Sequence, residues 1–230
     1  MSRVIYFASA LFNGREAGFN SLIAEKLEDL GYEVILPQRN GFEFGRLTEA
    51  LSAKLPEEEI GPAVQKIIYL LDMGIFVPKS DVVLAILDEP LDEGMVVEIS
   101  YARMMNKLVI GTRTDVRSPY GLLSDPLMGM HFFPAYQCDI FIRHYMPNKT
   151  PEERRKQMAN LLEKIDNAIK MFSAKEHREV DPEVERASEL LFYGLKDIHS
   201  EESLEIIVSR YLEHKEELKK IGPILLPNYL

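Results

Sequence analysis

The chain has 230 residues, of which 46% are hydrophobic and 28% are charged, a composition typical of a globular protein with a buried core. Its 27 Lys and Arg residues against 37 Asp and Glu residues give a net charge of −10, which argues against an extended surface for nucleic acid or anionic membranes. A single cysteine, Cys138, excludes an intramolecular disulfide, and no apolar run reaches about 18 residues, so we expect a water-soluble, cytoplasmic protein without a membrane segment.

The first half of the chain alternates strand-like and helix-like patterns. Short apolar runs of strand length are found at Val4–Ser9, Glu33–Leu36, Asp81–Leu87 and Leu108–Thr112. Apolar residues three or four positions apart, typical of helices, are found over Glu16–Leu30, Val64–Ile75 and Met95–Asn106. This alternation predicts an α/β fold, a doubly wound and mostly parallel sheet of the flavodoxin or Rossmann type.

The sequence changes character after residue 147. Three charged, helix-favouring stretches without a strand pattern follow, at Pro151–Phe172, Pro182–Tyr193 and Glu201–Lys220. We therefore predict an α/β catalytic domain over residues 1–147 and a C-terminal helical extension over residues 148–230.

Carboxylates gather in one segment, SDVVLAILDEPLDEGMVVEISYA, which spans Ser80–Ala102. Asp81 opens a buried strand, Asp92 precedes the next helix, and Glu98 lies about one turn into that helix among apolar residues. Asp92 could equally be a helix cap, and Glu98 could equally be structural. Paired carboxylates at the carboxyl edge of a sheet suit glycosyl transfer, in which one anion traps an oxocarbenium-like carbon.

Other motifs point away from cofactor chemistry. The sequence contains neither a GxGxxG dinucleotide fingerprint nor a P-loop, and its histidines do not form an HExxH metal motif. We therefore expect neither a cofactor nor a metal. Arg113, Arg117 and Arg143 could meet a 5′-phosphate or could simply be solvated.

Three segments together resemble one family. The opening YFASALFNGREAGFNSLIAEKLEDLGYEVILPQR, the carboxylate segment and GTRTDVR are similar, in order and at compatible spacings, to nucleoside 2-deoxyribosyltransferases. The resemblance covers about residues 4–117. It implies that a deoxyribosyl group moves through a covalent glycosyl-enzyme intermediate.

The resemblance also implies site residues. Glu98 would be the nucleophile, with Tyr6 donating a hydrogen bond that orients it. Asp81 and Asp92 would hold the nucleobase and supply the proton that helps it leave. The remaining contacts to the substrate would come from Phe12, Gln38 and Gly94. Without the family, Tyr6 and Phe12 could be core aromatics and Gln38 a loop amide.

The sequence departs from the family after the RTD motif. Relatives usually carry an asparagine after the RTD motif that reaches into a neighbouring subunit's site, but no asparagine occurs between Asn106 and Asn148. Asp125 is the candidate substitute.

The leading functional expectation is a nucleoside 2-deoxyribosyltransferase that forms a glycosyl intermediate on Glu98. The same intermediate with water as acceptor would give a deoxynucleoside or deoxynucleotide 5′-monophosphate N-glycosidase. A non-catalytic nucleotide-binding module is the third alternative. The expected partners are a nucleoside or nucleotide and a free nucleobase, not a nucleic acid polymer or a membrane, and the resemblance implies a homo-oligomer.

Overall fold

A computed structural model describes residues 2–41, 44–146, 150–171 and 182–218. The chain forms two compact units, each made of two separate segments. The first unit comprises Met1–Arg39 and Phe76–Arg178, and the second comprises Asn40–Ile75 and Glu179–Leu230.

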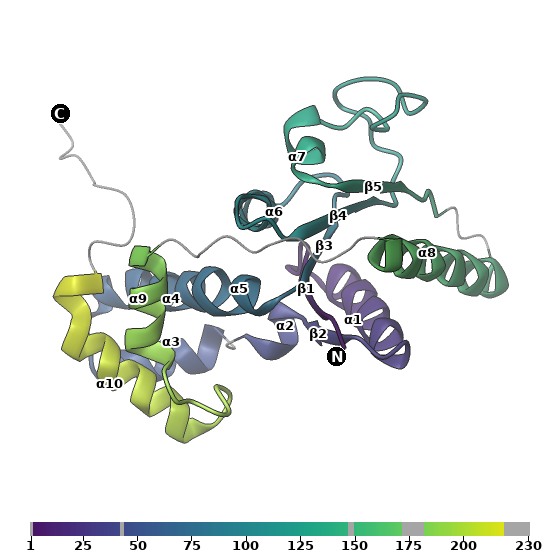
Figure 1. The fold of residues 1–230 in the computed structure, drawn as a ribbon. Coiled ribbons are helices and arrows are strands. Elements are labelled where there is room, and N and C mark those ends of the chain that lie inside the picture. Colours follow the sequence, from purple (N-terminus) through teal and green to yellow (C-terminus); the bar gives the residue numbers. More distant parts are fainter. Residues whose placement is uncertain (1, 42–43, 147–149, 172–181, 219–230) are drawn as a thin grey trace, which may run out of the picture. The chain divides into compact units, whose positions relative to one another are not determined.

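The first unit is built on a parallel sheet of five strands in the order β2-β1-β3-β4-β5 (Figure 1). The strands are β1 (Val4–Ala8), β2 (Glu33–Ile35), β3 (Val82–Ile86), β4 (Leu108–Arg113) and β5 (Ile140–Arg143). This strand order is that of flavodoxin-like folds, so the predicted fold class is confirmed. The fifth strand was not predicted because it is a four-residue edge strand.

Helices cover both faces of this sheet. The helices that contact the strands are α1 (Gly14–Asp29), α6 (Glu93–Met104) and α8 (Pro151–Met171). The shorter helices are α2 (Pro37–Asn40, whose last residue belongs to the second unit), α5 (Val77–Lys79) and α7 (Phe132–Gln137). Alternate strand residues such as Ile5 and Leu84 join α1 and α8 in one apolar core. The intervening residues, Tyr6 and Val83 among them, face the opposite side, where α6 packs on the sheet (Figure 1).

Helix α8 belongs to this core, although its residues were assigned to the predicted extension. Leu161 and Ile165 are fully buried and share the apolar cluster with residues of β1 and β3. The predicted boundary at residue 147 therefore differs from the division that the structure shows. The periodicity of α8 predicted an amphipathic helix, but periodicity does not identify the surface that covers its apolar side.

The second unit is helical. It contains α3 (Phe44–Ser52), α4 (Glu57–Leu71), the π-helical turn η1 (Asp72–Phe76, whose last residue belongs to the first unit), α9 (Pro182–Phe192) and α10 (Glu201–Leu218). Helix α4 packs on α3 and α9, and α10 packs on α9 and α3. The Ser188 hydroxyl donates a 3.1 Å hydrogen bond to the Leu70 carbonyl, which joins α9 to α4. The last two helices thus pair with residues 40–75, which the sequence analysis placed in the catalytic domain.

One helical segment within the described ranges, Glu57–Lys79, is long and apolar enough to cross a membrane by length and composition alone. Its residues Val64, Ile67 and Leu70 are buried in the second unit. Packing inside a protein core therefore accounts for the apolar composition of this segment.

His144 joins the end of β5 to α8. Its Nε2 lies 2.9 Å from the Gln157 carbonyl, and Lys164 Nζ lies 3.1 Å from its Nδ1. Because an ammonium group can only donate, Nδ1 is the acceptor and Nε2–H is the donor to Gln157. Burial, together with the Lys164 charge, lowers the pKa of His144 below its usual 6.5.

This histidine predicts a pH-dependent stability. Below about pH 6.5 the unfolded chain binds a proton that the folded protein binds less readily, so the free energy of unfolding falls with falling pH until the lowered pKa is passed. Urea denaturation between about pH 7.5 and pH 5 should show a smaller fall for His144→Gln than for wild type. Replacing the exposed His199 with Gln is the control, and an equal effect of both substitutions would contradict the assignment.

Candidate active site

Tyr6 and Glu98 form the centre of the candidate site. Tyr6, on β1, is completely buried, and its phenol donates a 2.8 Å hydrogen bond to Oε1 of Glu98. Glu98 lies on α6, the helix that follows β3. Strand order reverses between β1 and β3, and ligands of doubly wound sheets bind at such a switch point. The structure therefore brings together the two residues that the resemblance paired.

Asp92 and Gly94 begin α6. The Asp92 carboxylate accepts a 2.6 Å hydrogen bond from the Met95 amide, so it acts as the N-cap. A β-carbon on Gly94 would lie 3.2 Å from Asp92 Oδ1, which explains why glycine suits this position. Both residues lie at the carboxyl edge of the sheet, where the site was predicted.

Asp81 lies at the opposite edge of the sheet. It precedes β3, its carboxylate accepts a 2.8 Å hydrogen bond from the Val4 amide, and its charge acts on the buried Lys107. The five residues of β3 span about 16 Å and separate Asp81 from the loop that leads to α6. The structure therefore favours a structural role for Asp81 over the predicted contact with the nucleobase, because the residue before a parallel strand lies at its amino end.

Gln38, at the start of α2, is held by α1. Its Nε2 donates to the Ala17 carbonyl at 2.8 Å and to the Ser21 hydroxyl at 2.9 Å, and its Oε1 accepts from Asn20 at 3.2 Å. Both ends of the amide thus have protein partners. Contact with a base would require Gln38 to exchange these bonds, so the structure favours the loop-amide interpretation.

Phe12 lies in the loop between β1 and α1, just before the helix cap Asn13. Its side chain is 77% exposed, which excludes the alternative that it is a core aromatic. An exposed ring at the carboxyl edge of β1 can offer one face to a planar ligand.

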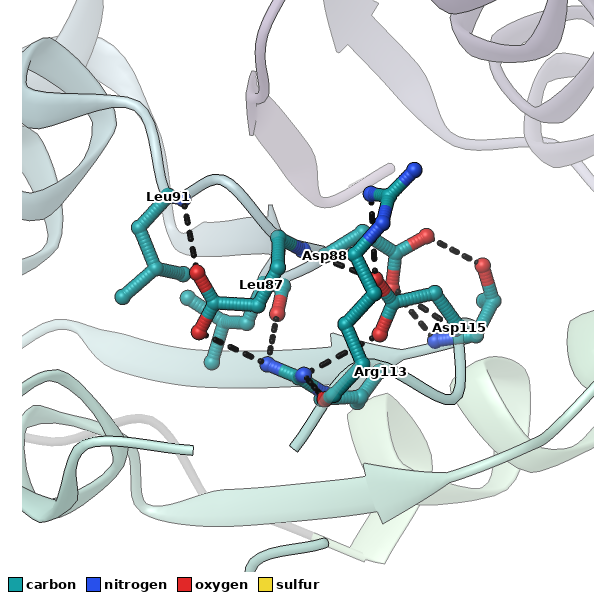
Figure 2. Close-up of polar contacts among 8 residues, drawn as sticks. Leu87, Asp88, Leu91, Arg113 and Asp115 are labelled. Atoms are coloured by element: carbon teal, nitrogen blue, oxygen red, sulfur yellow. Dashed lines mark hydrogen bonds and ion pairs between the residues drawn. The ribbon is translucent and has the colours of Figure 1, made fainter. Parts of the chain in front are cut away.

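Arg113 has a structural role that the sequence analysis did not predict. Arg113 is the last residue of β4 and is completely buried, and its guanidinium donates a 2.9 Å hydrogen bond to the Leu87 carbonyl (Figure 2). It also lies 3.1 Å from the carboxylate of Asp115 and 3.4 Å from that of Glu89. Arg113 is therefore neither solvated nor available to a phosphate, contrary to both interpretations of the sequence.

Asp125, the candidate substitute for the missing asparagine, organises its own loop. Its Oδ2 accepts a 2.8 Å hydrogen bond from the Leu122 amide. A β-carbon on Gly121 would approach the same oxygen to 2.5 Å. The structure thus gives this aspartate a local turn-forming role.

Asp72 is a carboxylate that the sequence analysis did not name as a candidate functional residue. It opens the π-helical turn η1, and burial raises its pKa from 3.8 to about 7. A carboxyl group that titrates near neutrality is a candidate functional group. The signal was present in the sequence, because Asp72 is the one charged residue in the apolar run IIYLLDMGIFV.

Substitution of Asp72 tests this burial. The folded protein favours the neutral form of the Asp72 carboxyl group. Asp72 therefore stabilises the folded state below about pH 4, and this stabilisation is lost as the pH rises through about 7. Relative to wild type, Asp72→Asn should gain on the order of 3 kcal/mol of unfolding free energy between pH 4 and pH 8. Thermal or urea unfolding at both pH values measures the gain, and a constant difference would contradict the shifted pKa.

One family model matches more than half of the chain. The model of the family described as nucleoside 2-deoxyribosyltransferase matches residues 5–161. No curated protein matches the chain.

Solved structures similar to this chain include a conserved protein from Enterococcus faecalis V583, with 22% identity and a TM-score of 0.47 over 73% of this chain and 99% of that one. A 2-deoxyribosyltransferase from Bacillus psychrosaccharolyticus has 18% identity and a TM-score of 0.41 over 60% and 85% of the two chains. The Clostridium botulinum CMP N-glycosidase BcmB has 16% identity and a TM-score of 0.39 over 72% and 99%.

Proposed function

Because the chain belongs to the nucleoside 2-deoxyribosyltransferase family, we propose that it transfers the 2-deoxyribosyl group of a nucleoside from one nucleobase to another. The observation that carries the proposal is the 2.8 Å hydrogen bond from the buried Tyr6 phenol to Glu98. A carboxylate held in this way at the switch point of the sheet is oriented for attack on a bound sugar.

The reaction has two half-steps. An oxygen of Glu98 attacks the anomeric carbon, the bond from that carbon to the base nitrogen breaks, and its electron pair leaves with the base, which gains a proton. A second base then attacks the same carbon, releases the Glu98 carboxylate and loses its proton. Tyr6 holds one carboxylate oxygen so that the other oxygen can approach the sugar.

Recognition of the base is assigned to residues at the same edge. Phe12 offers an exposed ring for stacking, and Asp92 supplies a carboxylate at the start of α6. Asp92 Oδ1 is used by the helix cap, so we assign its second oxygen, Oδ2, to the base. With Asp81 at the far edge of the sheet, Asp92 is the one of the two predicted aspartates that keeps this role.

The charges around the site support a free nucleoside as substrate. Arg113 is buried and paired with Asp115 and Glu89, and Arg117 lies 3.4 Å from Asp115. Carboxylates thus already neutralise the two arginines closest in sequence to the loop after β4. A 5′-monophosphate would have to compete with them for these cations.

A base-exchange assay tests the proposal. The protein is incubated with a deoxynucleoside, with and without a second free base, and in parallel with the corresponding 5′-monophosphate, and products are separated by chromatography. A new nucleoside that forms only with the second base is the expected result. Release of free base without an acceptor would indicate hydrolysis instead, and binding without any turnover would indicate a non-catalytic module.

We also propose that the protein is a homo-oligomer, as the family resemblance implies. Light scattering at micromolar concentration should give a mass that is a multiple of the chain mass. A monomer under these conditions would contradict this expectation.

A further inference from the structure

Arg113 and its neighbours link the loop that follows β3 to the loop that follows β4 (Figure 2). The Asp115 carboxylate accepts a 3.0 Å hydrogen bond from the Glu89 amide. In the other direction, the Asp88 carboxylate accepts hydrogen bonds from the Thr114 amide at 2.6 Å, the Thr114 hydroxyl and the Asp115 amide at 3.1 Å. Arg113 donates to the Leu87 carbonyl across the same gap.

The burial of this network is costly. Arg113 is completely buried, its Nε has no hydrogen-bond partner, and neither has Asp115 Oδ1, although that oxygen lies 3.1 Å from Arg113. Burial also raises the pKa of Asp115, as expected for a carboxylate that is incompletely compensated. Because buried ion pairs of this kind contribute little net stability, stability alone does not explain the arrangement.

The network lies directly before the helix that carries Glu98. Only four residues separate Leu87, held by Arg113, from Asp92, which caps α6. The position of the first turn of α6 therefore depends on where this short loop is held. A shift of that turn moves Glu98 relative to Tyr6, which is fixed in β1.

We propose that Arg113 is a positioning residue for the glycosyl-transfer reaction, which holds the loop after β3 so that α6 presents Glu98 to Tyr6 and to the sugar. The proposal rests on the function proposed above. Arg113 acts through the Leu87 carbonyl, Glu89 and Asp115, and does not itself touch the substrate. The planar guanidinium fork bonds two loops at once, which a lysine ammonium cannot reproduce with the same geometry.

The test compares Arg113→Lys with Arg143→Lys. Arg143 is the partner of Arg113 in the register of β4 and β5, but it is exposed, which makes it a matched control. We expect Arg113→Lys to lower kcat by about 10–100-fold with KM within about threefold of wild type, since misplacing a reacting group by about 1 Å can cost 100-fold. Arg143→Lys should change neither value, because the assay uses a deoxynucleoside without a 5′-phosphate.

Hydrogen exchange provides a readout that does not require turnover. In Arg113→Lys the amides of Met95 and Val96, in the first turn of α6, should exchange about tenfold faster, while those of the β3 core stay protected. A folded Arg113→Lys protein with wild-type kcat and unchanged exchange at these amides would overturn the proposal. If the wild-type protein does not transfer deoxyribose between bases, the proposed function fails. The hydrogen-exchange rates of Met95 and Val96 then decide by themselves whether Arg113 holds the start of α6.

A second variant covers the case in which Arg113→Lys does not fold. Thr114→Val keeps Arg113 and the backbone amide but removes the hydroxyl bond to Asp88. It should lower kcat by a few fold and accelerate exchange at Met95, again with KM unchanged. Wild-type values for both measurements in Thr114→Val would overturn the proposal.

Discussion

Glu98→Gln should lower the rate of base exchange by about 10⁴-fold or more, because the neutral amide cannot form the glycosyl intermediate. The substitution keeps the shape of the side chain and a possible partner for the Tyr6 hydroxyl, so the fold should be unaffected. Steady-state kinetics, with circular dichroism to confirm folding, measures the effect. Binding of the nucleoside should persist, which separates lost chemistry from lost affinity.

Glu93→Gln is the matched control for this experiment. Glu93 lies in the first turn of the same helix but is exposed. Its substitution should leave the rate within about twofold of wild type, because Glu93 is exposed and is not the carboxylate that Tyr6 holds. If Glu98→Gln kept wild-type turnover, Glu98 would not be the nucleophile.

Ile165→Ala should reduce the free energy of unfolding by roughly 2–5 kcal/mol, the usual cost of truncating a buried isoleucine. Ile165 is completely buried on α8 and shares the apolar core of the sheet. Chemical denaturation measures the loss. The prediction distinguishes the observed division of the chain from the one expected from sequence, in which α8 would lie outside the catalytic domain.

Met171→Ala serves as the control for Ile165. Met171 is at the end of α8 and is 80% exposed, so its truncation should cost less than about 0.5 kcal/mol. Equal losses for the two variants, or no loss for Ile165→Ala, would show that α8 is not part of the core of the sheet.

The fold was largely predictable because its signals are local. Four of the five strands are short apolar runs, and Asp92 at the start of α6 has the residue type of a helix cap. The pairing of helices is not a local property. The sequence therefore did not show that α8 packs on the sheet or that α9 and α10 pack with α3 and α4.

Residues of the candidate site could be predicted where the residue itself carried the signal. Glu98 was identified as a carboxylate in an apolar helix, and the same reasoning applied to Asp72 would have found the second such carboxylate. Asp81 was assigned to the base because its position in the motif was weighed above its position before the strand. The structural role of Arg113 was not predicted, because its burial results from two loops meeting at the carboxyl edge of the sheet, which no spacing along the chain reveals.

The most direct test of the central proposal is to trap the glycosyl-enzyme intermediate. The protein is mixed with a deoxynucleoside in the absence of an acceptor base and quenched in acid, and its peptides are analysed by mass spectrometry. We predict that the peptide containing Glu98 gains the mass of one deoxyribosyl group, and that Glu98→Gln gains none. Base exchange by an enzyme whose Glu98 peptide is never modified, or a modification on another residue, would contradict the mechanism.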